Sequence, residues 1–181
     1  MKHVIIIERI IPLFLFLFFL NSIISSQGKF IGFALNPKLG AYGSFSGGLP
    51  GTNFGAEFNI LVNRLIFGLD YYHSKFKFIG DKEEYFDQFD LLLGGYFDTF
   101  IDKDLNISLL RFQIQAGIGS FKGITYNDSK SVSTLGIPVK LGIKHLFSKS
   151  ISLGIDLQAN LNSQYPIYMI MGSLELGNLK K

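Results

Sequence analysis

The sequence predicts an all-β fold: an eight-stranded antiparallel up-and-down transmembrane β-barrel preceded by a signal peptide. Three observations support this fold class. An apolar leader opens the chain, apolar and polar residues alternate with a period of two through the remainder, and turn-forming residues interrupt the alternation at regular distances. The 181 residues correspond to one domain. We therefore expect a signal peptide over residues 1–28 and one outer-membrane barrel domain over residues 29–181.

The leader has the three parts of a secretory signal peptide. Lys2 and Arg9 provide positive charge, residues 10–20 are apolar, and the small residues Ser25, Ser26 and Gly28 offer cleavage sites. The alternative is a retained membrane anchor, because Ile23–Ile24 could extend the apolar run. The apolar run of residues 10–20 is short for a helical span, which needs about 20 apolar residues. We therefore expect cleavage after export through the inner membrane.

The remaining chain alternates as strands do. Residues 151–161 show the pattern most clearly, because Ile151, Leu153, Ile155 and Leu157 share one parity while Ser152 and Asp156 share the other. A strand separates these two sets onto opposite faces, whereas a helix cannot. The predicted strands are 33–45, 54–62, 65–76, 85–97, 110–119, 134–144, 151–161 and 167–177.

The connections between these strands differ in length. Residues 47–51 (GGLPG) and 123–130 (GITYNDSK) form polar loops, whereas Asn63–Arg64 and Ser148–Ser150 form tight turns. Loops one, three, five and seven are generally longer than turns two and six, and the fourth connection is the least clear. A barrel that starts in the periplasm has this asymmetry, with its longer loops outside the cell.

A soluble lipocalin-like barrel would show the same alternation with the faces reversed, and a soluble sandwich is a further alternative. Two groups of residues favour the membrane arrangement. Glycines gather on the polar face, where a narrow lumen is crowded: Gly40, Gly55, Gly68, Gly94, Gly117, Gly142 and Gly154. Aromatic residues on the apolar face gather near strand ends, like an interfacial girdle: Phe33, Phe45, Phe54, Tyr71, Tyr85, Phe97, Phe121, Phe147 and Tyr168.

Charged residues on the polar face predict a belt inside the barrel. The expected acidic arc is Glu57, Asp70 and Asp90. The expected basic group that faces it is Lys38, Arg111 and Lys140, with Asp156 and Lys144 beside it and Glu175 on the strand next to Lys38. Eight strands leave room for little more than side chains. We therefore interpret the belt as a structural plug, with an ion path or gate as the alternative.

The sequence offers little for catalysis or cofactor binding. It contains no cysteine, and the histidines after the leader, His73 and His145, fall on the apolar parity. His73 and Ser74 are adjacent on a strand and must point to opposite faces, which argues against a nucleophile–base pair. Loop residues Asp81, Glu83 and Glu84 are a weak cation candidate. We expect no catalytic residues, no metal site and no cofactor, and the absence of a basic patch argues against nucleic acid.

Residues 30–177 resemble the small outer-membrane β-barrel proteins of the OmpA/OmpX-like class. The resemblance rests on the leader, the eight alternating strands and the last strand, Tyr168–Leu176, with further likeness in residues 69–73 and 154–161. It implies a monomer in the outer membrane, in contact with outer-membrane lipid and assembled by the barrel-insertion machinery. The class usually ends on an aromatic residue, whereas this chain continues through Gly177–Lys181.

The resemblance and the belt together favour a non-catalytic structural or surface-interaction scaffold. The alternatives are a secreted lipocalin-like barrel that binds a lipid or hydrophobic ligand, and a lipid-modifying outer-membrane enzyme. The orientation of Leu153, Ile155 and Leu157 separates the first reading from the carrier, because a carrier needs these side chains inside.

Overall fold

The computed structural model describes residues 31–45, 50–77, 83–100, 109–125 and 131–179. The predicted signal peptide lies outside these residues, and the compact barrel unit begins at Ile31. Within the described ranges no helix is long and apolar enough to cross a membrane.

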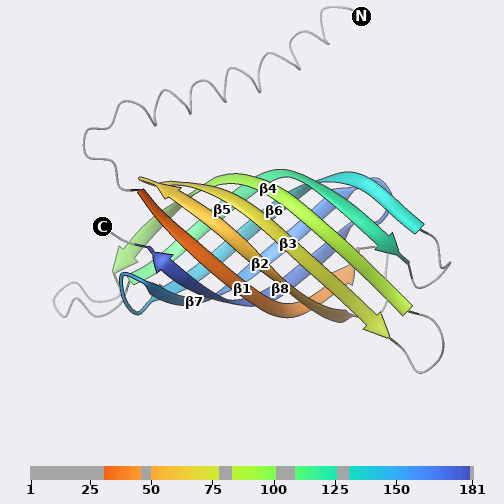
Figure 1. Ribbon diagram of the computed structural model, residues 1–181, viewed down its shortest axis with the longest axis horizontal. Coiled ribbons are helices and arrows are strands. Elements are labelled where there is room, and N and C mark those ends of the chain that lie inside the picture. The colour runs from red at the N-terminus through yellow and green to blue at the C-terminus, as the bar shows by residue number, and fades with distance from the viewer. Residues whose placement is uncertain (1–30, 46–49, 78–82, 101–108, 126–130, 180–181) are drawn as a thin grey trace, which may run out of the picture. The chain divides into compact units, whose positions relative to one another are not determined.

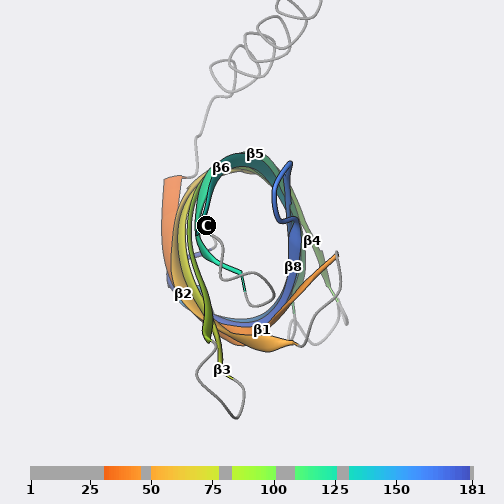
Figure 2. The same cartoon turned by 90° about the vertical axis from the view of Figure 1, so that its right-hand side faces the viewer.

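Eight antiparallel strands close into one barrel in which each strand pairs with its neighbours in sequence and β1 pairs with β8 (Figures 1 and 2). The strands are β1 (Ile31–Ser44), β2 (Gly51–Val62), β3 (Leu65–Lys77), β4 (Glu83–Phe100), β5 (Leu109–Ile124), β6 (Ser131–Leu146), β7 (Ile151–Asn162) and β8 (Ile167–Asn178). The predicted number, order and approximate positions of the strands are confirmed.

Every strand is at least one residue longer than predicted, and three of them extend at both ends. β4, β5 and β6 each continue past the predicted bounds at both ends. The added residues include Asp98, Lys122 and Ser133, which are polar like turn residues. In a tilted barrel such strands extend past the apolar zone, so polarity alone does not mark where pairing ends.

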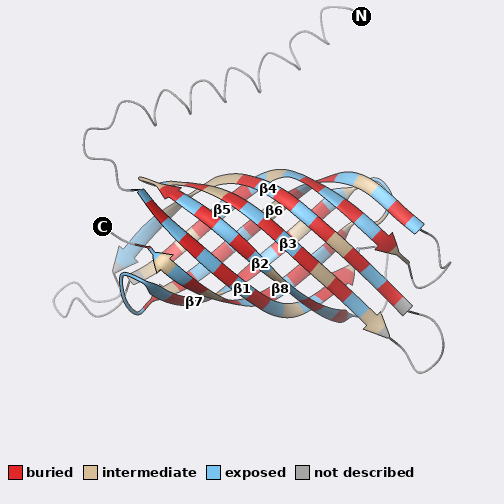
Figure 3. Ribbon diagram, in the orientation of Figure 1, coloured by how far each residue is buried: buried red, intermediate tan, exposed pale blue. Residues whose placement is uncertain are grey.

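The apolar rows lie on the outside of the barrel. Leu153, Ile155 and Leu157 of β7 are 48%, 58% and 48% exposed, whereas Ser152 and Asp156 are buried inside. Figure 3 shows the same alternation of buried and exposed residues along the other strands. The orientation is the one predicted for a membrane barrel and the reverse of that required by a soluble carrier.

The predicted outward aromatic residues are exposed, with one exception. Phe121 is only 1% exposed and points into the lumen, so that prediction was wrong. The alternation of β5 runs without a break to Ile124, which gives Phe121 the inward parity of Gln113 and Gln115.

The barrel has two distinct ends. We call one the loop end, where β1–β2, β3–β4, β5–β6 and β7–β8 connect, and the other the termini end, where β1 begins and β8 finishes. The β2–β3 and β6–β7 turns at the termini end are short, as predicted. The β4–β5 connection at the same end spans residues 101–108, which lie outside the described residues.

Apolar side chains fill the lumen near both ends. The loop-end cluster stacks Phe86 against Phe121 and Tyr165, with ring centroids 4.7 and 5.1 Å apart. Its buried members are Tyr42, Tyr72, Phe86, Phe121, Val132, Ile167, Met169 and Met171. The termini-end cluster consists of Ala34, Leu146 and Leu179. The polar part of the lumen lies between these two clusters.

Candidate functional site: a charged network inside the barrel

All nine charged residues of the predicted belt point into the lumen. Each is at most 4% exposed: Lys38, Glu57, Asp70, Asp90, Arg111, Lys140, Lys144, Asp156 and Glu175. The inward parity of each residue follows from the strand pleat. Their partners depend on the register between strands, and here the structure departs from several of the predicted contacts.

Six of the nine form one continuous chain of ion pairs, which we call the ion-pair chain. Its order is Asp70, Lys140, Glu57, Lys38, Asp156 and Lys144, so the sign of the charge alternates at every step. Lys140 Nζ lies 3.2 Å from Asp70, Lys38 Nζ lies 2.8 Å from Asp156, and Lys144 Nζ lies 2.7 Å from Asp156. Glu57 contacts both Lys38 and Lys140. Three cations and three anions balance one another, which is the condition under which buried charge is tolerated.

The ion-pair chain links strands that are distant in sequence. Glu57 of β2 and Asp70 of β3 are register partners, and Lys140 of β6 reaches both carboxylates across the lumen. Lys38 of β1 and Asp156 of β7 extend the chain to the strands beside β8. The network therefore cross-links opposite walls of the barrel as well as adjacent strands.

Neutral side chains complete the network. Asn36 Nδ2 donates to Glu57 at 2.9 Å, and the Tyr72 hydroxyl donates to Asp70 at 2.8 Å. Lys38 Nζ in turn donates to the Tyr72 hydroxyl at 3.3 Å. Sequence reasoning did not assign Asn36 and Tyr72 to this site. Their parity, which they share with Lys38 and Asp70, is the signal that could have found them.

Asp90 lies apart from the ion-pair chain. It is the register partner of Asp70, as predicted, but its Oδ2 accepts hydrogen bonds from two amides. Gln88 Nε2 lies at 2.5 Å and Gln158 Nε2 at 2.7 Å. No cation forms an ion pair with Asp90 within the described part of the chain.

Glu175 also has neutral partners. Ser152 Oγ donates to one carboxylate oxygen at 2.7 Å, and Gln113 Nε2 donates to the other at 3.2 Å. Glu175 and Lys38 both point inward from the two strands that close the barrel, as predicted. The β1–β8 register pairs Lys38 with Ser173, two residues before Glu175.

Arg111 is not part of the central network, contrary to prediction. Its Nε and Nη2 donate to Asp98 at 2.7 and 3.0 Å, and Nη2 also donates to the Leu179 carbonyl at 2.9 Å. The guanidinium lies 3.9 Å from the Tyr96 ring centroid. The β4–β5 pairing continues to Phe100↔Leu109, which places Arg111 opposite Asp98 and Gly119 opposite Asp90. Arg111 therefore stabilises the termini end.

The residues considered for catalysis do not assemble a catalytic site. His73 lies on the outer wall, with Nδ1 2.9 Å from Asp87, while Ser74 is buried inside and donates to Asn53. His145 has the same outward parity and packs edge-on against Phe147. The adjacent His73 and Ser74 side chains thus point away from each other, as the strand geometry requires.

Of the loop carboxylates considered from sequence as a cation site, only the Glu84 side chain lies among the described residues. Glu84 lies in β4 with its side chain buried, where it accepts hydrogen bonds from Tyr42 at 2.8 Å and Tyr165 at 3.2 Å. Burial, together with Glu84, raises the pKa of Tyr165. Asp81 and the Glu83 side chain lie outside the described residues. Among the described residues, no group of three acidic, histidine or cysteine side chains could hold a metal ion.

No protein-family model and no curated protein matches the chain. Among solved structures, the chain is similar to Neisserial surface protein A (NspA), with 11% identity and a TM-score of 0.55 over 83% of this chain and 99% of that one. The N-terminal β-barrel domain of Pseudomonas aeruginosa OprF has 12% identity and a TM-score of 0.57, over 81% of this chain and 96% of that one. Ail, the attachment invasion locus protein of Yersinia pestis, has 12% identity and a TM-score of 0.52, over 84% of this chain and 99% of that one.

These three proteins are eight-stranded outer-membrane barrels. The sequence-based resemblance to this class is therefore confirmed for the fold, which is what a likeness at such low identity shows. Ail has also been crystallised in complex with the heparin analogue sucrose octasulfate.

Proposed function

We propose that the protein is a non-catalytic outer-membrane β-barrel that serves as a structural or surface-interaction scaffold, with its lumen closed by side chains. The observation that carries this proposal is the distribution of polarity across the barrel wall. Charged residues fill the centre of the lumen, and bulky apolar side chains cover the outside.

The outer surface is suited to lipid. Leu39, Ile118 and Leu135 are 69%, 67% and 78% exposed, and similar residues occupy every strand. Soluble monomers rarely expose a contiguous apolar area of more than a few hundred Å². In a bilayer the same rows would contact acyl chains at no cost.

Three layers of side chains support a closed lumen. The loop-end cluster, the ion-pair chain and the termini-end cluster follow one another along the barrel axis. The ion-pair chain crosses the lumen between β6 and β2, so that an ion would have to displace paired charges to pass.

The strand order and connections support an orientation. Both ends of the described barrel lie at the termini end, together with the short β2–β3 and β6–β7 turns. We place this end in the periplasm and the loop end outside the cell. Any surface interaction would then involve the four loop-end connections, and the barrel-insertion machinery would assemble the monomer.

Cell fractionation tests the location. The full chain with its leader, expressed in a double-membraned bacterium, should appear in the outer-membrane fraction and lose the leader. It should also migrate differently on gels with and without heating, because closed barrels resist detergent until heated. Recovery as a soluble periplasmic protein would refute the membrane assignment and favour the carrier.

Planar-bilayer recording tests the closed lumen. The purified barrel should give no conductance steps of the size that general porins produce, because side chains fill the lumen. Insertion is checked independently by protease protection of lipid vesicles that contain the same purified barrel. Frequent porin-sized steps from correctly inserted protein would overturn the plug.

A further inference from the structure

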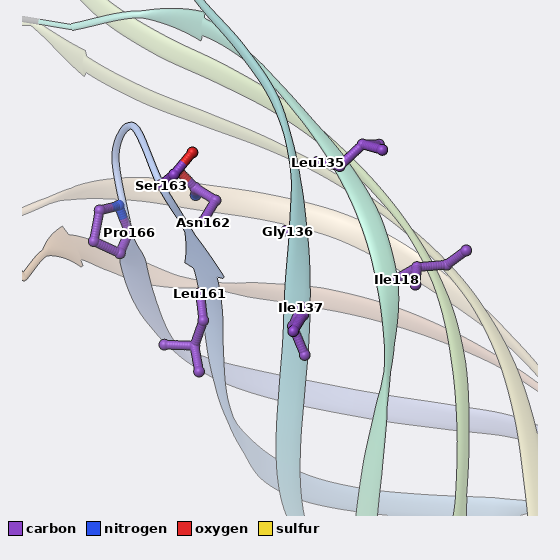
Figure 4. A pocket seen from close by; sticks show the side chains of 8 residues that line it. All are labelled: Ile118, Leu135, Gly136, Ile137, Leu161, Asn162, Ser163 and Pro166. Atoms are coloured by element: carbon purple, nitrogen blue, oxygen red, sulfur yellow. The ribbon is translucent and has the colours of Figure 1, made fainter. Parts of the chain in front are cut away.

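A hollow of about 680 Å³ opens on the outer wall near the loop end. Four apolar side chains line it: Ile118 of β5, Leu135 and Ile137 of β6, and Leu161 of β7 (Figure 4). Each is at least half exposed. Asn162 and Pro166 border the hollow at the β7–β8 turn. We call this feature the wall groove.

Strand pairing is interrupted where the wall groove lies. Among the described residues, the β5–β6 register passes from Ala116↔Val139 to Gly119↔Gly136 without a pair between them. Pro138 lies in this gap, and proline has no N–H to donate to the sheet. The two side chains that belong to the gap and point outward are Ile118 and Ile137, which both line the groove.

The end of β7 forms the other border of the groove. Its pairing with β6 finishes at Gly136↔Asn162, whereas β6 continues to Ser131 beside β5. β6 therefore extends beyond β7 toward the loop end. The groove is thus a consequence of strand lengths and of Pro138, both of which are built into the fold.

A polar patch adjoins the groove on the side of the loop end. Lys122 and Ser133 are register partners with exposed side chains, and Ser120 is the register partner of the groove residue Leu135. Four residues separate Lys122 from Ile118, which places the cation about 13 Å farther along the strand. Asp87, the β4 partner of Lys122, interacts electrostatically with the Lys122 charge and also contacts His73 at 2.9 Å and Tyr71 at 2.8 Å.

We propose that the wall groove binds one lipid with a phosphorylated headgroup. Its acyl chain would lie against Ile118, Leu135, Ile137 and Leu161, and its phosphate would contact the Lys122 ammonium and the Ser133 hydroxyl. The cation at the open, polar side of an apolar groove selects an anionic amphiphile. This inference rests on the proposed membrane location.

Photocrosslinking in nanodiscs tests the acyl-chain part of the proposal. The refolded barrel is placed in phosphatidylcholine nanodiscs that contain a small share of phosphatidylglycerol with a diazirine on one acyl chain. After irradiation, labelled peptides should concentrate on residues 118, 135–137 and 161. Labelling spread evenly over the outward residues of all strands would overturn the proposal.

Two variants sharpen this test. Ile137→Trp fills the groove and should reduce labelling of residues 118 and 161 about fivefold or more. Ile155→Trp is the matched control, since Ile155 is exposed to the same extent on the outer face of β7, and it should leave the labelling unchanged. Equal labelling in the two variants would contradict a role for the groove.

The headgroup is tested by comparing the phosphatidylglycerol probe with a diacylglycerol that carries the same diazirine chain. Lys122→Gln should lower labelling by the phosphatidylglycerol probe about threefold while labelling by the neutral probe stays constant. Lys149→Gln, which removes a charge at the termini end, is the control. Even labelling of an inserted barrel would refute lipid binding in the wall groove and leave the membrane location standing. Failure of the barrel to insert would refute the proposed membrane location.

Discussion

At the scale of single residues, Lys140 links opposite walls of the barrel. Its ammonium group is fully buried and contacts Glu57 and Asp70, which belong to adjacent strands on the opposite wall. Removing one member of a buried ion pair leaves the partner charge without compensation, which costs about 3–5 kcal/mol. Lys140 therefore joins Asp70, at one end of the ion-pair chain, to the rest of that chain.

Lys140→Met should lower the free energy of unfolding by about 3–5 kcal/mol, because Asp70 loses its cation and Glu57 keeps only Lys38. Urea unfolding of the barrel in lipid vesicles, followed by the heat-dependent shift on gels, measures the change. A decrease below about 1 kcal/mol would show that the chain of ion pairs contributes little.

Asp90→Asn should behave differently from Lys140→Met. Asp90 has amide partners and no ion pair among the described residues, and asparagine keeps an oxygen that can accept from Gln88 and Gln158. Removing this buried charge should leave the unfolding free energy unchanged or raise it. A loss as large as that of Lys140→Met would mean that the negative charge of Asp90 is itself required.

At the scale of elements, the last strand is anchored at its end. The Leu179 amide donates to the Lys149 carbonyl at 2.8 Å, and the Leu179 carbonyl accepts from Arg111. The Leu179 side chain is buried in the termini-end cluster. Leu179, which follows β8, therefore helps to fill the termini end of the lumen.

Arg111→Ala should loosen this anchor and leave the ion-pair chain intact, because Arg111 contacts Asp98 and Leu179 and no member of the chain. Hydrogen exchange at the Leu179 amide should accelerate tenfold or more, while exchange in β2 and β3 stays slow. Arg64→Ala, at the exposed β2–β3 turn, is the control. Faster exchange throughout the barrel would instead support the original prediction that Arg111 holds the central belt.

The accuracy of the sequence-based predictions differs between parity and register. Parity follows directly from a period of two, so all nine belt residues were assigned to the lumen correctly. Register depends on the connections. The tight turn at Asn63–Arg64 fixes how β2 aligns with β3, so the Glu57↔Asp70 pair could be predicted. The long connection at residues 101–108 does not fix how β4 aligns with β5. Arg111 was consequently assigned to carboxylates that it does not reach.

Side-chain partners across the lumen were the hardest to predict. Lys140 reaches Glu57 from the opposite wall, and no local pattern in the sequence relates β6 to β2. The wall groove was not predicted either, because it depends on where pairing stops at Asn162 and around Pro138. Pro138 within an alternating segment was the available signal.

At the scale of the whole molecule, the polarity of the barrel is inverted relative to a soluble protein. The lumen holds balanced charges between two apolar clusters, and the outer wall presents apolar rows, as suits the lipid contact proposed above. Stability and location are therefore linked, because the outer rows contribute to stability when the surrounding medium is a bilayer.

The outward face of β7 provides the most direct test of this account. The chain has no cysteine, so nitroxide labels can be placed singly at residues 151–161. In vesicles, labels at Leu153, Ile155 and Leu157 should collide readily with dissolved oxygen and poorly with a water-soluble nickel complex, while a label at the inward-facing Ser152 should be protected from both. Strong collisions of the nickel complex with the labels at 153, 155 and 157 would contradict the membrane barrel.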